Sequence, residues 1–80
     1  MARYGVQTRL SPEETIQKAM AFFGKDGVGL EITDRGPCRV TFQGGGDHVS
    51  LTVNEGKKTE VELVTHEFDY DVKQFVRQIA

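Results

Sequence analysis

The sequence predicts an α+β domain of two layers, in which two helices cover one face of a five-stranded antiparallel sheet. Two stretches near the ends of the chain carry apolar residues at three- and four-residue spacing, whereas the stretches between them alternate apolar and polar residues. These spacings are typical of amphipathic helices and of half-buried strands, respectively. With 80 residues, the chain is expected to form one domain, residues 1–80, around one hydrophobic core. The predicted order is β-α-β-β-β-β-α.

The first strand and the first helix follow directly on one another. The segment RYGVQTRL alternates, and its inward residues are Tyr4, Val6 and Leu10. In the next segment, LSPEETIQKAMAFFG, Ser11 suits the helix cap, Pro12 the first helical position, and Glu14 the acidic position of a capping box. We therefore expect a helix over residues 12–23, ended by Gly24 in the left-handed conformation.

Four further strand patterns follow. Their inward residues are Val28, Leu30 and Ile32 in the first, Val40 and Phe42 in the second, Val49, Leu51 and Val53 in the third, and Val61 and Leu63 in the fourth. The last element is a helix in FDYDVKQFVRQIA, capped by Asp69 and running to the C-terminus. Its apolar residues at helical spacing are Val72, Phe75, Val76 and Ile79.

Three consecutive glycines, Gly44 to Gly46, stand between two of the strand patterns in TFQGGGDH. A phosphate-binding glycine loop leads from a strand into a helix N-terminus, whereas a strand follows here. A two-residue turn at Gly45 and Gly46 keeps inward residues opposite one another, because it pairs Phe42 with Val49. The sequence thus favours a hairpin turn over an anion-binding loop.

Two other turns complete the predicted meander. A turn with Gly56 in the left-handed position would place Val53 opposite Lys57 and His48 opposite Glu62. A three-residue turn in DRGPC would bring Leu30 to Phe42 and Ile32 to Val40. One face of the sheet is then apolar and the other polar.

A strand, a helix, a four-stranded meander and a terminal helix resemble the repeat unit of the TATA-binding protein and a shortened helix-grip domain of the START type. The resemblance rests on element order over the whole chain. It implies the sheet order 1-5-4-3-2, since the first strand lies beside the last in both folds. It also implies either DNA binding on the sheet or an apolar ligand held between the sheet and the helices.

Charge and composition narrow these alternatives. Ten basic residues stand against twelve acidic ones, and the predicted polar face carries Glu31, Glu60 and Glu62, so nucleic acid is not expected as a partner. No segment is apolar over the length of a membrane span. The single cysteine, Cys38, cannot form an internal disulfide. These observations favour a cytoplasmic protein that does not bind membranes.

Few residues combine into a reactive set. We expect Cys38 to point inward as a small apolar residue, on the opposite face from His48. A metal-dependent or acid/base enzyme using His48, Glu62 and His66 is an alternative, because imidazole and carboxylate suit zinc or iron. Strand spacing sets the two histidines roughly 13 Å apart, which opposes a shared ion, and an exposed His48 paired with Glu62 is favoured.

A non-catalytic interaction module or small-ligand-binding module, without a cofactor, is therefore the favoured function. An apolar ligand, if one binds, is expected between the two helices and the sheet, at Phe23, Phe42, Phe75 and Ile79. Self-association is also expected, because a minimal domain with two free sheet edges gains stability from it. A homodimer or a complex with another protein is the predicted assembly.

Overall fold

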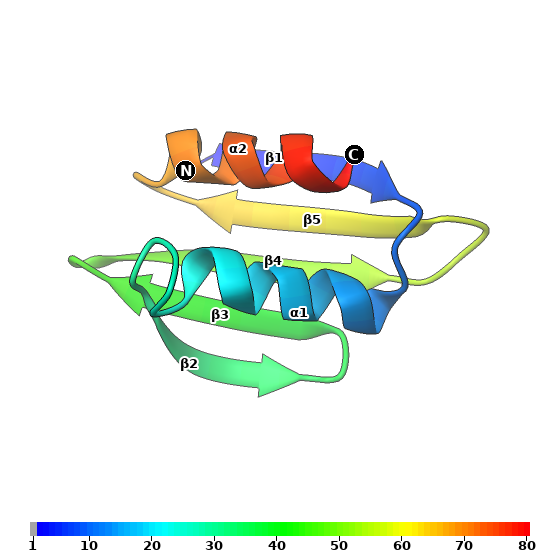
Figure 1. Cartoon of the computed structure of the whole chain (residues 1–80). Coiled ribbons are helices and arrows are strands. Elements are labelled where there is room, and N and C mark those ends of the chain that lie inside the picture. Colours follow the sequence, from blue (N-terminus) through cyan, green and yellow to red (C-terminus); the bar gives the residue numbers. More distant parts are fainter. Residues whose placement is uncertain (1) are drawn as a thin grey trace.

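We describe a computed structural model of the chain, in which residues 2–80 are described. Seven elements follow one another in the predicted order (Figure 1). They are β1 (Ala2–Thr8), α1 (Pro12–Phe23), β2 (Glu31–Gly36), β3 (Arg39–Gly44), β4 (Asp47–Asn54), β5 (Thr59–Thr65) and α2 (Asp69–Ile79). The class is α+β, as the alternation of helical and strand spacings predicts.

The five strands form one antiparallel sheet of order β1-β5-β4-β3-β2, which confirms the predicted topology. Both helices lie on the same face: α1 packs over β3 and β4, and α2 packs over β1 and β5 (Figure 1). The edge strand β2 extends past α1 and is exposed along most of its length. The other face of the sheet has no helix over it.

Helix α1 begins as the sequence predicts. The Ser11 hydroxyl accepts a hydrogen bond from the N–H of Glu14 at 3.1 Å, and the Glu14 carboxylate accepts one from the N–H of Ser11 at 3.2 Å. This reciprocal pair satisfies two N–H groups that the first helical turn leaves free. The predicted left-handed Gly24 is wrong, because its backbone is extended, with φ −75°. The left-handed glycine after this helix is Gly29, with φ 95°.

Helix α2 starts one residue away from its predicted cap. Asp69 is its first residue and Phe68 occupies the cap position, without a side-chain hydrogen bond to the helix N-terminus. The buried hydroxyl of Thr65 accepts a hydrogen bond from the N–H of Phe68 instead. The prediction of Asp69 as the cap was wrong because this carboxylate is engaged by Tyr4 of β1.

The glycine turn is confirmed. Gly45 and Gly46 both have positive φ, 60° and 83°, which is the geometry of a tight hairpin turn of the primed type. Phe42 pairs with Val49, and Val40 with Leu51, as the turn requires. All four side chains are buried.

The predicted register between β4 and β5 was wrong. Val53 pairs with Val61 and not with Lys57, Leu51 pairs with Leu63, and Gly56 does not have a positive φ. The observed register buries Leu51 against Leu63, whereas the expected one would have set a lysine opposite a core valine. Burial thus outweighs the turn signal.

Strand β2 also differs from expectation. It spans Glu31–Gly36, a bulge shifts its register between Ile32 and Asp34, and Ile32 lies opposite Phe42. Ile32 was expected inside but is 45% exposed, since β2 lies beyond the helices. The turn to β3 has two residues, and Cys38 within it is exposed, which contradicts its predicted burial.

The core lies between the sheet and the helices. Fourteen apolar residues are buried there, drawn from both helices, from β3, β4 and β5, and from the segment before β2. The largest fully buried side chains include Phe23, Phe42 and Phe75. Of the described side-chain polar atoms that are buried, none lacks a hydrogen-bond partner. The layers are thus closely packed and fully paired.

Candidate functional site

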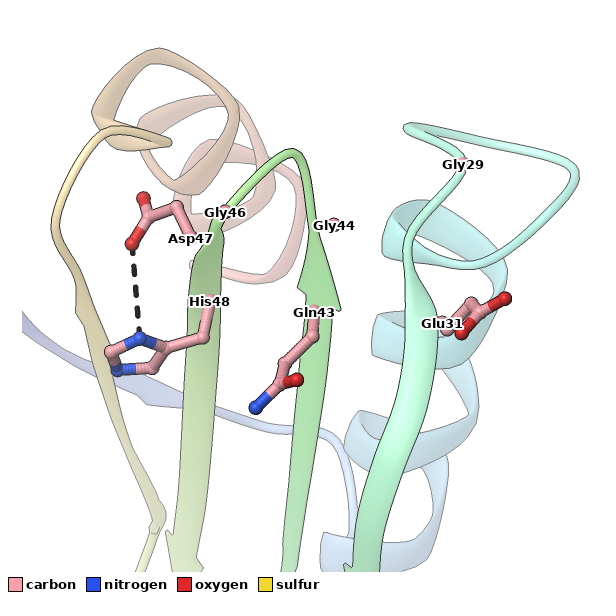
Figure 2. Close-up of a pocket in the computed structure, with 7 residues that line it drawn as sticks. All are labelled: Gly29, Glu31, Gln43, Gly44, Gly46, Asp47 and His48. Carbon is pink, nitrogen blue, oxygen red and sulfur yellow. Dashed lines mark ion pairs between the residues drawn. The ribbon is translucent and has the colours of Figure 1, made fainter.

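A polar hollow lies beside the glycine turn, at one end of β2, β3 and β4 (Figure 2). Its lining residues are Gly29, Glu31, Gln43, Gly44, Gly46, Asp47 and His48. The side chains of Asp47, His48 and Gln43 lie along neighbouring strands, whereas Glu31 on β2 points away from them. Three of its four polar side chains, Gln43, Asp47 and His48, come from the β3–β4 hairpin, and the fourth, Glu31, comes from β2.

Asp47 is the most buried charged group of this corner, with 7% of its side chain exposed. Burial alone would raise the pKa of its carboxyl, but hydrogen bonds from the N–H groups of His48 and Glu67 outweigh burial and hold the pKa below its ordinary value. The charges of His48 and His66 act in the same direction. Through its hydrogen bond with the N–H of Glu67, the Asp47 carboxylate therefore links the glycine turn to the loop that precedes α2.

Two histidines, His48 and His66, are the sequence neighbours of the residues joined by this hydrogen bond, Asp47 and Glu67. His48 Nδ1 lies 3.7 Å from a carboxylate oxygen of Asp47, and the His48 carbonyl accepts a hydrogen bond of 2.9 Å from the Thr65 hydroxyl. Thr65 pairs with Val49 at the end of the β4–β5 ladder, and His48 and His66 are the next residues beyond this pair. The expected spacing of roughly 13 Å between the two histidines assumed that His48 lies opposite Glu62, a pair that the observed register does not contain.

Glu62 does not join the histidines. It lies opposite Thr52 on β4 and Gly5 on β1, and its carboxylate is 3.8 Å from Arg3. The predicted pairing of His48 with Glu62 was wrong for the same four-residue register error. Among residues 2–80, no three His, Cys, Asp or Glu side chains gather as a metal site would require.

The residues expected to line an apolar pocket lie in the core. The ring centroid of Phe23 is 5.3 Å from that of Phe42 and 5.4 Å from that of Phe75, within the usual range for aromatic pairs. Ile79 is 5% exposed and borders a surface hollow with Leu10, on the side away from the glycine turn. The three phenylalanines thus pack together between the sheet and the helices.

Cys38 lies at the opposite end of the β3–β4 hairpin from His48. It occupies the turn after Pro37, and its carbonyl accepts a hydrogen bond of 2.8 Å from the N–H of Val53. The hairpin is six residues long on its β3 side, so a thiol at one end and an imidazole at the other do not meet. The two groups form no nucleophile–base pair.

The open face of the sheet is polar across all five strands. From β1 to β2 its polar side chains are Arg3, Gln7, Glu60, Glu62, Asn54, Thr52, Ser50, His48, Gln43, Thr41, Arg39, Asp34 and Glu31, and one apolar side chain, Val64 of β5, lies among them. Two ion pairs lie on it, Arg3 with Glu62 at 3.8 Å and Arg39 with Asp34 at 3.0 Å. Acidic and basic groups alternate with hydroxyls and amides on this face.

The hydrogen bond between the Asp47 carboxylate and the N–H of Glu67 was not predicted from the sequence. Its partner, the N–H of Glu67, lies 20 residues away and belongs to the backbone, so no residue type marks it. The Thr65 link had a signal, since a threonine three residues before Phe68 can cap the turn into a helix. The signal was hidden by the more obvious Asp69.

Comparisons with protein-family models, with curated proteins and with solved structures find no match for this chain. Within residues 2–80, neither helix is long and apolar enough to cross a membrane.

Proposed function

We propose that this domain is a non-catalytic protein-interaction module that works through the open face of its sheet. The observation that carries the proposal is the contrast between the two faces. The covered face is filled by buried aromatic rings, whereas the open face presents side chains of both charges and no helix. A sheet face with hydrogen-bonding groups of both kinds suits another polypeptide better than a small apolar ligand.

Charge distribution supports a protein partner over nucleic acid. Glu60, Glu62 and Glu31 stand on the same face as Arg3 and Arg39, and the chain carries a formal charge of −2. Phosphate backbones favour an excess of basic residues, whereas protein interfaces pair charges of both signs. A partner surface with alternating charges is the expected match.

Site-specific photo-crosslinking in cells that make the protein tests the proposal. A photoreactive residue at Thr52, exposed in the middle of the open face, should give a defined protein adduct. The matched control is the same residue at Arg77, exposed on α2, which should give none. Adducts from Arg77 alone would place the working surface on the helices and overturn the proposal.

The alternative is a small metal-dependent or acid/base enzyme at the polar corner. The contact of His48 with Asp47 favours it, because a buried carboxylate can orient an imidazole for proton transfer. Metal analysis of untagged protein discriminates. Stoichiometric zinc or iron, lost in His48→Ala and His66→Ala variants but kept in Glu62→Gln, would favour the enzyme.

A further inference from the structure

The two free edges of the sheet differ in how they are protected. At one edge, β2 has a bulge, three charged residues in six and a following proline. These features are the usual means by which proteins prevent edge-to-edge pairing. At the other edge, β1 pairs with β5 over all seven of its residues without a bulge, contains no proline and carries one charge, at Arg3. The β1 edge is thus open to a further strand.

We infer that a second copy of the chain docks on this edge, with β1 antiparallel to the partner copy's β1, so that the two sheets become one sheet of ten strands. The inference rests on the proposed function, since self-association is one form of it. A strand paired with itself about a two-fold axis satisfies backbone groups of both copies at once. The register that pairs all seven residues, Ala2–Thr8, centres on Gly5.

This register is self-complementary in its side chains. On the open face, Gly5 meets Gly5 and Arg3 meets Gln7 of the other copy, so no like charges oppose each other. On the covered face, Tyr4 meets Val6. A β carbon added at Gly5 would meet no atom within 4 Å, so the centre of the interface is free of obstruction.

The helix side of the edge also has apolar area to bury. Tyr4 and Val6 point toward the helix layer yet remain only partly buried, because no strand lies beyond β1. Val76 on α2 is partly buried as well, and it lies two turns after Asp69, the residue that Tyr4 contacts. Pairing of the two edges would bring these three side chains of each copy together. The interface is one strand and part of one helix, at the small end of specific interfaces, so a weak dimer is expected.

Two charge variants at Gln7 test the pairing. Gln7 lies opposite Glu60 within the chain and opposite Arg3 across the proposed interface. Gln7→Lys should stabilise the monomer and weaken the dimer, whereas Gln7→Glu should destabilise the monomer and tighten the dimer. Each pair occurs twice in the dimer, so the dimer Kd from sedimentation equilibrium should change by about 2- to 30-fold in each direction. Thermal unfolding of dilute protein gives the opposite order and separates the two effects.

A disulfide at the two-fold axis tests the register. In a Cys38→Ser background, Gly5→Cys should form a covalent dimer on mild oxidation, because residues directly opposite lie within disulfide reach. Gln7→Cys in the same background should not, since the two cysteines would lie roughly 13 Å apart along the strands. A wild-type protein that stays monomeric at its highest soluble concentration would overturn the inference. So would a dimer that is insensitive to both Gln7 variants and not crosslinked through position 5. If the protein is monomeric but a photoreactive residue at Thr52 gives a defined protein adduct, the proposed function is supported although this inference is not.

Discussion

The hydroxyl of Tyr4 donates a hydrogen bond of 3.1 Å to the carboxylate of Asp69, across 65 residues of sequence. It joins β1 to the first turn of α2, and the hydroxyl of Thr8 makes a second link by donating to the carbonyl of Ile79 at the other end of the helix. Helix α2 is therefore fastened to the edge strand at both of its ends. The edge proposed for self-association is held in place by these two bonds.

Alkaline pH should weaken the Tyr4 link. Burial, and then the hydrogen bond and the negative charge of Asp69, raise the pKa of Tyr4 above its ordinary value. Because the folded pKa is raised, the stability that this link contributes is present below about pH 10 and is lost as pH rises through the folded pKa. Urea unfolding at a series of pH values should show this loss in the wild type and not in Tyr4→Phe. Tyr70→Phe, which alters a side chain of a residue that is 74% exposed, should behave as the wild type.

Acidic pH should weaken the hydrogen bond that the Asp47 carboxylate accepts from the N–H of Glu67. The folded pKa of Asp47 lies below its ordinary value of 3.8, so its contribution is present above that value and is lost as pH falls through the folded pKa. Asp47→Ala should lower the urea midpoint at pH 7 and flatten the acid side of the stability curve. Asp26→Ala changes an exposed carboxylate in a loop and serves as the control. Equal acid sensitivity in the wild type and Asp47→Ala would contradict this assignment.

The glycine turn should tolerate asparagine but not alanine. Gly45→Asn keeps a residue pair suited to two positive φ angles, so fold and binding should be unchanged. Gly46→Ala puts a β carbon at φ 83° and should cost about 1–2 kcal/mol of unfolding free energy. Chemical denaturation measures both. Loss of binding at unchanged stability in Gly45→Asn would revive the anion-loop interpretation.

Removal of the α1 cap should have a moderate cost. Ser11→Ala deletes the acceptor of the Glu14 N–H bond, and we expect a loss of about 1 kcal/mol. Ser11→Thr keeps a hydroxyl acceptor and should recover most of this loss. If both variants unfold at the same denaturant concentration as the wild type, the capping box does not contribute to stability.

The parts of the fold that depend on local signals were predictable from the sequence. The capping box at Ser11 and Glu14 lies within one turn, and the turn at Gly45 fixes a register by itself. The sheet order followed from a likeness in element order. The capping box and the glycine turn are each decided by residues a few positions apart, whereas the sheet order depends on the order of the elements along the chain.

The parts that depend on long-range packing were not predictable. In the link between Asn54 and Thr59, the turn signal at Gly56 predicts a different register from the one that buries Leu63 against Leu51, and burial decides the register of β5. An error of four residues in that register produced the predicted pair of His48 with Glu62, which the structure does not contain. The bulge between Ile32 and Asp34 was likewise not predicted, because the alternation of residues along β2 carries no sign of it.

The position of β1 at the sheet edge also determines the order in which the chain can fold. Val6 pairs with Val61, so the first strand to be synthesised has its neighbour near the end of the chain. At about 5–20 residues per second, a ribosome needs several seconds to supply that neighbour. The hairpin at Gly45 can close within microseconds of emerging, since its contacts are local. During synthesis, β1 therefore stays unpaired until β5 has been made, and the meander can assemble before β1 joins the sheet.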